Sequence, residues 1–471
     1  MKQSKSFYKI LTVILLTLSL LIFVIMFGAL LLGCGNVKKQ NDGTAKESYR
    51  AFTRSEAFNL RQVITADSTT SRTIMWQSET EEKDAFVEYR IAQSDAIAKE
   101  NAKPAQDKAA LNKTENAKAE ADTAPNKNAI AAQKERINDK FTDNGKTTWV
   151  HTVRLNGLKP GMKYEYRLGC GDRRSQWHTF MTAQGNSYKA LIFPDSQSAN
   201  YKSWEEVAMP AWQCNPDAQF FIAMGDLVDN GEHAYQWNEL FTRIRPMITS
   251  IPAAPLLGNH ETYTMDWKVR MPLAYLHYFT LPDGAPEAYK NQFYSFDYGD
   301  VHFAVLNTQM REMEQFQPDL LKEQLAWFKA DMEKTKKKWK IVLMHKDVLQ
   351  YGFLTRKTPR EEGISEEGRV FMPLFDRYNV DVVLTAHLHT YRNRGHIYDF
   401  KRNEKGPLYI LTGVAGDVRY PGLWKRHALD VVLAPQPETD NYMVMEADGD
   451  MLKFSCYLPN GEQVDEVVVR K

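Results

Sequence analysis

The chain has 471 residues, of which 43% are hydrophobic and 25% charged, and its formal net charge is +1. A chain of this length can form two or three domains with a large core, and the composition is that of an ordinary globular protein. A net charge this close to zero argues against a nucleic-acid-binding protein that works by neutralising phosphates. It excludes no small anionic substrate, because one site can be charged within a neutral whole.

The N-terminus carries a membrane-targeting pattern. Basic residues precede an apolar run over residues 10–32, which is long enough to span a bilayer. The run is followed by Gly33 and Cys34, and this ending resembles a bacterial lipobox. We expect residues 1–34 to be a signal peptide or membrane anchor and residues 35–52 a linker. The rest would be exported and held at the cell envelope, as a lipoprotein or by an uncleaved signal-anchor.

Short strands separated by turn residues follow the linker, for example the alternating residues 71–76. From about 96 to 144 the composition shifts to Ala, Lys, Glu and Asn, which predicts a polar insert, either a solvated helix or a loop without a core of its own. Residues 155–167, with Asn-Gly-Leu-Lys-Pro-Gly and then Tyr-Glu-Tyr-Arg, resemble the signature of fibronectin type III-like domains. The resemblance implies an all-β sandwich over residues 53–185 with a structural role.

Beyond Cys34, the cysteines are few and widely spaced: Cys170, Cys214 and Cys456. An odd number at such spacing indicates neither a disulfide framework nor a zinc cluster. Scattered thiols are the favoured interpretation, and a Cys170–Cys214 pair in an oxidising compartment is the alternative.

From residue 186 onward, apolar strands alternate with helical stretches. The strands are expected over residues 189–193, 220–224, 301–306, 340–344, 380–385 and 408–412. This alternation predicts an α/β domain over residues 186–471.

Five apolar runs of this domain are followed, at once or after one residue, by Asp, Asn or His. The residues concerned are Asp195, Asp226, Asn259, His345, and His387 with its neighbour His389. Sites in α/β sheets are built at the carboxyl ends of strands, so we expect these side chains to meet. Carboxylate, amide and imidazole together suit Mn, Fe, Zn or Co. The set is too large for one ion, whereas two ions that share one carboxylate would use all of it.

The ordered motifs D-x-Q, G-D-x-x-D, G-N-H-E, H and A-H-x-H resemble those of the calcineurin-like metallophosphoesterase superfamily. The β-sandwich ahead of them is similar to that of the purple acid phosphatase-like branch. The resemblance implies a four-layer α/β/β/α catalytic domain with two metal ions, Fe, Mn or Zn. The implied metal ligands are Asp195, Asp226, Asn259, His345, His387 and His389.

The resemblance also implies individual roles. Asp226 bridges both ions, Asp195 and His389 bind the first, and the remaining ligands bind the second. A metal-bound hydroxide would attack phosphorus, because coordination lowers the pKa of water. His260 is not a ligand and would stabilise or protonate the leaving oxygen. The catalytic residues would then be Asp226 and His260, and the substrate contacts would come from His260, Asn259 and His233.

The sequence departs from the family pattern at several positions. Purple members carry a tyrosine three residues after the bridging aspartate, where this chain has Asp229. This predicts that the charge-transfer colour is absent. Gln197 stands where D-x-H or D-x-G is common, and it would bind a metal through its carbonyl oxygen or only hold a water. Asp229 would be a further ligand or a partner of one. The later histidine of the loop after His345 is absent, and Arg356, Lys357 or Arg360 could contact a substrate anion instead.

The sequence therefore predicts an exported, membrane-held phosphoesterase that hydrolyses monoesters of a phosphorylated small molecule, with no nucleic-acid partner. A phosphodiesterase or pyrophosphohydrolase using the same metal site is the first alternative. A non-catalytic surface binding protein with a decayed site is the second. The complete ligand set argues against decay, since a decayed site would have lost a member.

Overall fold

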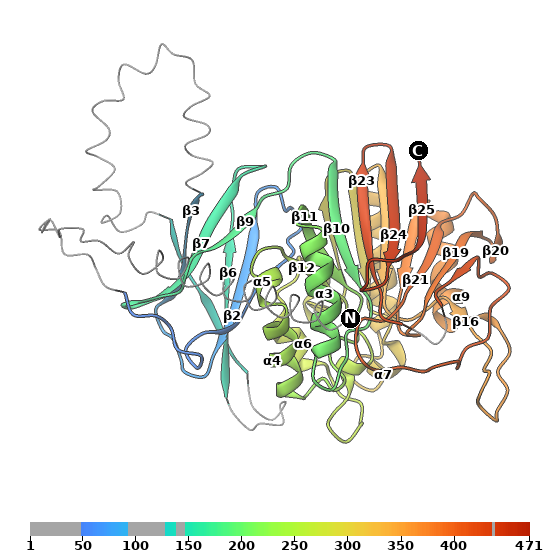
Figure 1. The fold of residues 1–471 in the computed structure, drawn as a ribbon, viewed down its shortest axis with the longest axis horizontal. Helices are drawn as coiled ribbons and strands as arrows, with labels where there is room; N and C mark the ends of the chain where they lie inside the picture. Colours follow the sequence, from blue (N-terminus) through green and yellow to red (C-terminus); the bar gives the residue numbers. More distant parts are fainter. Residues whose placement is uncertain (1–48, 93–127, 138–146, 436–438) are drawn as a thin grey trace, which may run out of the picture. The chain divides into compact units, whose positions relative to one another are not determined.

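The computed structural model describes residues 49–92, 128–137, 147–435 and 439–471 (Figure 1). These residues belong to one compact unit, Tyr49–Lys471. The predicted signal peptide or anchor and most of the predicted linker lie outside the described residues. Within the described ranges, no helix has the length and apolar character needed to cross a membrane. Export and membrane attachment therefore stay predictions.

The N-terminal part is a β-sandwich whose core contains Trp76, Val87, Tyr166 and Phe180. One of its sheets contains β1 (Phe58–Val63), β2 (Arg72–Ser78), β6 (Thr148–Leu155) and β5 (Gln133–Ile137). The other contains β4 (Ala129–Ala131), β3 (Ala85–Ile91), β7 (Lys163–Cys170), β8 (Arg173–Arg174) and β9 (His178–Met181). Along β6 and β7, buried side chains that face the core largely alternate with less buried ones that face outward. The fibronectin-like region thus has the predicted all-β architecture.

The polar insert predicted over residues 96–144 is partly regular structure. Residues 128–137 contain β4 and β5, which pair with β3 and β6. β5 has four exposed residues and buries Ile137, which is 1% exposed. A strand at the edge of a sheet can be almost entirely polar on its outer side, so composition alone does not reveal it. The remainder of the insert lies outside the described residues.

The first catalytic sheet is continuous with one sheet of the sandwich. Its strands are β10 (Ser187–Phe193), β11 (Ala218–Ala223), β12 (Ala253–Pro255), β23 (Tyr442–Asp448), β24 (Met451–Tyr457) and β25 (Gln463–Arg470). β12 pairs in parallel with β1, with Val63 opposite Ala253. The combined ten-stranded order is β25-β24-β23-β10-β11-β12-β1-β2-β6-β5. The two predicted domains therefore share a backbone hydrogen-bond network.

The second catalytic sheet is mixed, with the parallel strands β14, β15, β18 and β21 at its centre. Its strands are β13 (Tyr294–Tyr298), β14 (Val301–Leu306), β15 (Trp339–Met344), β18 (Val382–Thr385), β21 (Leu408–Thr412), β19 (Tyr391–Tyr398), β20 (Lys401–Arg402) and β22 (Val432–Leu433). A separate small ribbon joins β16 (Leu349–Gln350) to β17 (Gly363–Ile364). β14 and β18 are buried along their whole length, and β15 is buried except at Lys340, as expected for strands covered on both faces.

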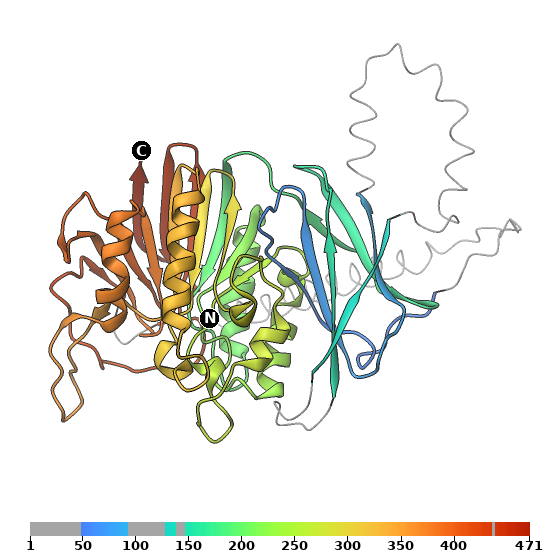
Figure 2. The ribbon, with the colours of Figure 1, turned by 180° about the vertical axis from the view of Figure 1, so that it is seen from behind.

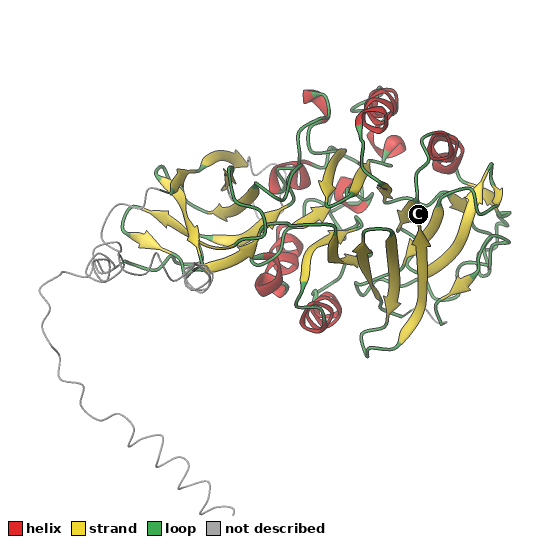
Figure 3. Ribbon diagram, turned by 90° about the horizontal axis from the view of Figure 1, so that it is seen from above, coloured by secondary structure: helices red, strands yellow, loops and turns green. Residues whose placement is uncertain are grey.

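The two catalytic sheets pack face to face. Phe220 of β11 contacts Phe296 of β13 and Phe303 of β14, with ring centroids 5.9 and 5.8 Å away. α3 (Lys202–Cys214), α4 (Ala234–Arg243) and α5 (Arg245–Ile248) flank the first sheet (Figure 1). α8 (Leu320–Lys334) and α9 (Glu366–Arg377) cover the second (Figure 2). Figure 3 shows helices on both outer sides of the sheets, the α/β/β/α order expected from the sequence.

Short helices lie in the connecting loops: η3 (His260–Thr262), α6 (Leu273–Tyr278), η4 (Glu287–Tyr289) and α7 (Met310–Met313). The longer α9 begins with a regular cap, since the Ser365 hydroxyl accepts from the Gly368 amide and two glutamates occupy the first turn. On α8, Leu320, Gln324, Phe328 and Met332 are buried at a spacing of four residues, which forms one inward face.

The three cysteines of the described residues are free thiols. Cys170 and Cys456 are buried, whereas Cys214 is exposed. The Cys170 thiol donates to the Glu82 carboxylate, 3.1 Å away, so it has a polar partner within the sandwich. The alternative Cys170–Cys214 pair is not formed.

Candidate metal centre

Loops after five strands meet where the carboxyl edges of the two catalytic sheets face each other. β10, β11 and β12 of the first sheet precede three of the loops, and β15 and β18 of the second precede the other two. The loops carry Asp195, Asp226, Asn259 with His260, His345, and His387 with His389. The residue types expected from the sequence therefore arrive from both sheets at one place.

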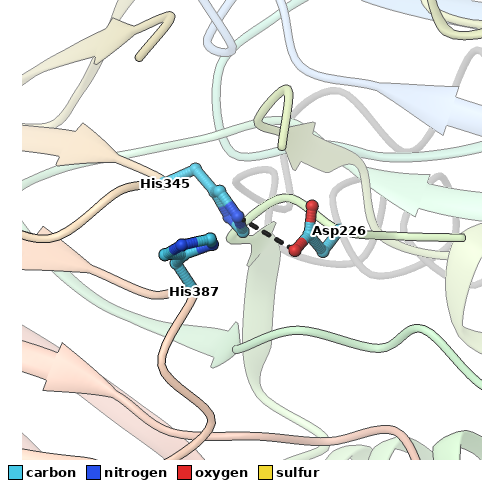
Figure 4. Close-up of side chains that lie close together, drawn as sticks. All are labelled: Asp226, His345 and His387. Atoms are coloured by element: carbon cyan, nitrogen blue, oxygen red, sulfur yellow. Dashed lines mark ion pairs between the residues drawn. The ribbon is translucent and has the colours of Figure 1, made fainter. Parts of the chain in front are cut away.

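Two groups of possible metal ligands form there, and they share Asp226. One group is Asp226, His345 and His387; the other is Asp195, Asp226 and His389. Within each group the ligand atoms lie within 4.8 Å of one another. Figure 4 shows the side chains of the first group turned toward a common point. One shared carboxylate between two groups is the geometry that a dinuclear centre requires.

The backbone around Asp226 is shaped by glycines. Asp226 itself adopts a left-handed conformation, with φ of 47°. A Cβ on Gly258 would lie 2.2 Å from Asp226 Oδ1, and one on Gly225 would lie 2.6 Å from His345 Nδ1. Only glycine allows the loops to approach this closely. The Gly-Asp and Gly-Asn pairs of the motifs are therefore required by the packing of the site.

His345 brings a nitrogen lone pair toward two oxygen atoms. Its Nδ1–H donates to the Met224 carbonyl, 2.9 Å away, which leaves Nε2 without a proton in the neutral ring. Nε2 lies 3.0 Å from Asp226 Oδ2 and 3.3 Å from Asn259 Oδ1. A proton on Nε2 or a metal ion can lie between these atoms. Burial opposes protonation, but the Asp226 carboxylate outweighs it and raises the pKa of His345 to about 9.

The second group repeats this arrangement. His389 Nδ1–H donates to the Val418 carbonyl, 2.8 Å away, and Nε2 lies 3.0 Å from Asp195 Oδ2. The Asp195 carboxylate also accepts from the His387 backbone amide at 3.1 Å. His387 Nδ1 is buried without a hydrogen-bond partner among the described residues, and burial lowers the pKa of this imidazole. A neutral, unpartnered imidazole beside carboxylates fits a metal ion.

Glu261 holds the loops in place, a role that the sequence motifs did not assign. Its buried carboxylate accepts from the amides of Asp226, Leu227, Val228 and Gly258 at 2.7 to 3.2 Å. Burial and the nearby charge of Asp226 raise the pKa of Glu261 to about 7, while the amide donors favour its ionised form. The one available signal was an acidic residue directly after His260 in G-N-H-E.

His260 is oriented by Asp229. The His260 Nδ1–H donates to the Asp229 carbonyl at 2.8 Å, and Nδ1 lies 3.3 Å from the Asp229 carboxylate. His260 Nε2 faces the metal groups, 4.0 Å from Asp226 Oδ2. Burial opposes protonation, but Asp226 and Asp229 raise the pKa of His260 to about 10. Asp229, predicted as a candidate ligand or partner, belongs to neither ligand group found in the described chain.

Gln197, the other candidate ligand, is fully buried beside His260. Its Nε2 lies 3.5 Å from His260 Nε2, and its Oε1 has no hydrogen-bond partner among the described residues. A buried amide oxygen without a partner costs about 1 to 3 kcal/mol, so a cation or a water would be favoured next to it. The predicted role of Gln197 as a carbonyl-oxygen ligand remains a prediction.

His233 and the arginines lie around the site. His233 precedes α4, and its ring packs 5.8 Å from Tyr235. His233 belongs to neither ligand group found among the described residues, and its predicted phosphate contact stays a prediction. Arg360 lies over the rings of Phe353 and Trp424, at 4.4 and 5.1 Å.

A cleft of about 340 Å³ opens next to the metal groups. It is lined by Asn259, Tyr263, His387, Arg360 and Lys346, among others. The Lys346 ammonium is paired with the Glu312 carboxylate at 2.8 Å. Of the three cations expected to replace the missing histidine, Arg360 is the one that lines this cleft.

Aromatic rings surround the site, and the sequence analysis did not identify them. Tyr420 packs 4.9 Å from the ring of His389. Tyr263 and Trp267 lie 5.4 and 5.8 Å from the ring of His260. These residues occur in loops outside the motifs, so nothing in their spacing indicated that they approach the metal groups.

Comparison with known proteins agrees with the fold. Residues 188–391 match the calcineurin-like phosphoesterase family, and residues 58–182 match the purple acid phosphatase N-terminal domain. The probable inactive purple acid phosphatase 9 of Arabidopsis thaliana is 24% identical over 344 residues, covering 62% of this chain and 51% of that protein. The acid phosphatase type 7 of Homo sapiens is 26% identical over 306 residues, covering 59% and 67%.

A solved structure has the same fold. The purple acid phosphatase from yellow lupin (Lupinus luteus) seeds superposes with a TM-score of 0.64 at 16% identity, covering 88% of this chain and 74% of that one. The matches define the class: this chain contains a calcineurin-like phosphoesterase domain, and its homologues indicate a metal-dependent phosphoesterase. Within that class it carries the purple acid phosphatase N-terminal domain. The aligned parts span about half to two thirds of the two curated relatives.

Proposed function

We propose that this protein hydrolyses phosphate monoesters at a dinuclear metal centre on the exported side of a membrane. The observation that carries the proposal is the sharing of Asp226 between two ligand groups, each completed by histidines from the second sheet. The names of the relatives, acid phosphatase and purple acid phosphatase, support monoesters as the substrate class.

The bound metal ions would supply acidification of a water molecule and neutralisation of the phosphate oxygens. The side chains do the rest. Asp226, Asp195 and His389 would hold one ion, and Asp226, Asn259, His345 and His387 the other. Because His345 and His389 each donate Nδ1–H to a backbone carbonyl, their Nε2 atoms are fixed toward the centre.

His260 would act on the leaving group. Its Nε2 faces the centre, and its Nδ1 is held by Asp229, so the ring is oriented without being a ligand. A protonated His260 can donate to the oxygen that leaves phosphorus, which contributes about 10²- to 10⁴-fold in general acid catalysis. Asp229 stays beside the ring and favours its charged form.

The position of Asp229 bears on the colour of the metal centre. Where a tyrosine would give an iron centre its colour, this chain places a carboxylate that contacts His260 instead. We therefore propose a colourless centre of Mn, Zn or Fe without the tyrosinate. A mixed set of carboxylate, amide and imidazole donors suits these ions.

Membrane attachment is proposed from residues 10–32 and Cys34. Replacement of Cys34→Ala separates the two modes of attachment. A lipoprotein would lose its lipid and its processing, whereas a signal-anchored protein would stay in the membrane fraction. A protein recovered wholly from the cytoplasm, with or without the substitution, would contradict export.

The test of the activity uses the full chain in detergent. The protein is stripped with a chelator, reloaded with Mn, Zn or Fe, and assayed for phosphate release from monoesters, diesters and pyrophosphate. We expect phosphate release to depend on the metal and kcat/KM to be highest for the monoesters. A preference for diesters or pyrophosphate would favour the phosphodiesterase or pyrophosphohydrolase alternative. No release from any ester with any metal would favour a binding protein.

A further inference from the structure

A short hairpin places an exposed indole next to His260. Tyr263 and Val269 pair across the hairpin, and Trp267 lies near its tip. The Trp267 side chain is 57% exposed although its ring is only 5.8 Å from that of His260 and almost perpendicular to it. Tyr263 lies 6.0 Å from the indole and completes an aromatic corner beside His260.

The hairpin is tied to the loop that carries the Asp226 motif. The Asn230 side-chain amide donates to the Thr264 carbonyl at 3.0 Å, and Arg270 forms an ion pair with Glu232. Within the turn, the Trp267 amide donates to the Thr264 carbonyl at 3.0 Å. The indole is therefore placed at a defined position relative to His260, since both belong to segments fixed on the same loop.

Folding alone does not explain a tryptophan at this position. The Trp267 backbone has φ of 61°, in the left-handed region where Gly and Asn are favoured and a bulky residue is strained. More than half of the side chain stays in contact with water, so burial offsets little of that cost. The ring contacts of Trp267 among the described residues are with His260 and Tyr263. An indole here is best explained by a ligand that covers it.

The charges near the tip are already paired. Lys268 contacts the Asp266 carboxylate at 2.5 Å, and Arg270 is paired with Glu232. An anionic leaving group would therefore find no uncommitted cation in these pairs. What remains open to a ligand is the aromatic surface, and flat rings stack on such a surface better than saturated rings do.

We infer that Trp267, supported by Tyr263, recognises the leaving group and selects phosphate monoesters whose leaving group carries a flat aromatic or heteroaromatic ring. The inference rests on the proposed function, because that function places the leaving oxygen at His260. In the hydrolysis, the bond from phosphorus to the leaving oxygen breaks and that oxygen takes a proton from His260, while water supplies the new oxygen on phosphorus. The ring of the leaving group then lies against the indole.

The test compares two esters of matched size and leaving-group acidity: benzyl phosphate, which has a flat ring, and cyclohexylmethyl phosphate, which does not. The metal-loaded wild-type protein is compared with Trp267→Ala and Trp267→Phe. We expect Trp267→Ala to raise KM for benzyl phosphate about fivefold to tenfold, and KM for cyclohexylmethyl phosphate by less than about twofold. Trp267→Phe should keep most of the discrimination, because a ring remains.

A matched control is Tyr398→Ala, which removes another exposed ring, 40% exposed, at the end of β19. Its KM values should equal those of the wild type. A second readout needs no turnover: calorimetric binding of benzylphosphonate and cyclohexylmethylphosphonate should show the same loss of discrimination in Trp267→Ala. If Trp267→Ala does not fold, Trp267→Leu removes the flat ring while it keeps apolar volume.

Four outcomes decide the inference. The inference is supported if Trp267→Ala no longer discriminates between the two esters but still hydrolyses cyclohexylmethyl phosphate. Equal changes for both esters would show that Trp267 only positions His260, and unchanged KM values would show that it has no role; either result overturns the inference and leaves the proposed function standing. A wild-type protein that hydrolyses neither ester with any metal overturns both.

Discussion

The Nε2 atom of His345 lies 3.0 Å from Oδ2 of Asp226, while the opposite ring nitrogen donates to the Met224 carbonyl, 2.9 Å away. Nε2 is therefore the ring nitrogen that faces the carboxylate. Without a metal ion, a proton on Nε2 joins the two atoms, in line with the raised pKa of His345. A metal ion satisfies both, and Asp226 takes part in the same arrangement for a second ion.

The shared carboxylate should be the least replaceable ligand. Asp226→Asn keeps the size of the side chain and its contact with the His260 amide, but removes the charge that both ions share. We expect the number of bound ions to fall and kcat to drop by about 10³-fold. Elemental analysis and phosphate release on the same sample check this. Unchanged turnover would rule out the bridging role.

Glu261 should matter for stability as well as for the site. Glu261→Gln replaces one acceptor oxygen by an NH₂ group that faces the amides of Asp226, Leu227, Val228 or Gly258. A buried amide left without its acceptor costs about 1 to 3 kcal/mol, so we expect a loss of that order and weaker metal binding. Thermal unfolding with and without metal measures both.

The control for this variant is Glu239→Gln on α4, which removes a half-exposed pair with Arg243. Surface pairs of this kind contribute less than about 1 kcal/mol. A thermal unfolding midpoint for Glu261→Gln as high as that of Glu239→Gln would contradict a supporting role for Glu261.

The position of Asp229 predicts a change in pH dependence. Its carboxylate helps to raise the pKa of His260, so Asp229→Asn should lower that pKa. His260 would then lose its proton at a lower pH. The basic limb of the pH profile of kcat should therefore shift to lower pH. The same profile measured for His260→Ala should lack that limb. A basic limb that does not move in Asp229→Asn would remove Asp229 from the account of His260.

His302 provides a pH-dependent contribution to stability outside the metal groups. Its two ring nitrogens lie 2.8 Å from Asp297 Oδ1 and 2.8 Å from Asp331 Oδ2. Burial disfavours the charged ring, but the two carboxylates outweigh it and raise the pKa of His302 to about 9. Because the folded pKa is raised above the unfolded value of about 6.5, this stabilisation is complete below about pH 6.5 and is lost as the pH rises through about 9.

The comparison of wild type with His302→Gln checks this contribution. Near pH 6 the variant should be less stable by an amount on the order of 2 to 3 kcal/mol, and the difference should shrink as the pH approaches 9.5. Unfolding midpoints at both pH values are the measurement. A difference that is constant with pH would mean that His302 contributes through packing alone.

Much of the site could be predicted because parallel strands bring their carboxyl ends to one edge. Asp195, Asp226 and His345 each lie within three residues of the end of a buried strand, so their convergence depends mainly on the sheet topology. The histidines at 387 and 389 need left-handed backbone, with φ of 76° and 54°, to reach both groups. That local turn is not visible in the spacing of the sequence.

What the sequence did not reveal depends on contacts between distant segments. The sequence indicates only a charged loop residue at Glu261, but the folded loops bury its carboxylate against backbone amides. Trp267 lies outside every motif and approaches His260 only through the hairpin. The pairing of β12 with β1 joins the two domains, with Val63 opposite Ala253. The hydrophobic pattern within each strand does not specify which strand it pairs with or in which register.

The most direct test of the account is the metal stoichiometry of the reconstituted protein, measured together with its phosphatase activity. Chelator-treated protein should release no phosphate from a monoester. Activity should return as Mn, Zn or Fe is added and should reach its maximum at two ions per chain, without a strong visible absorption band. Saturation at one ion per chain, or full activity after complete removal of metal, would contradict a dinuclear centre bridged by Asp226.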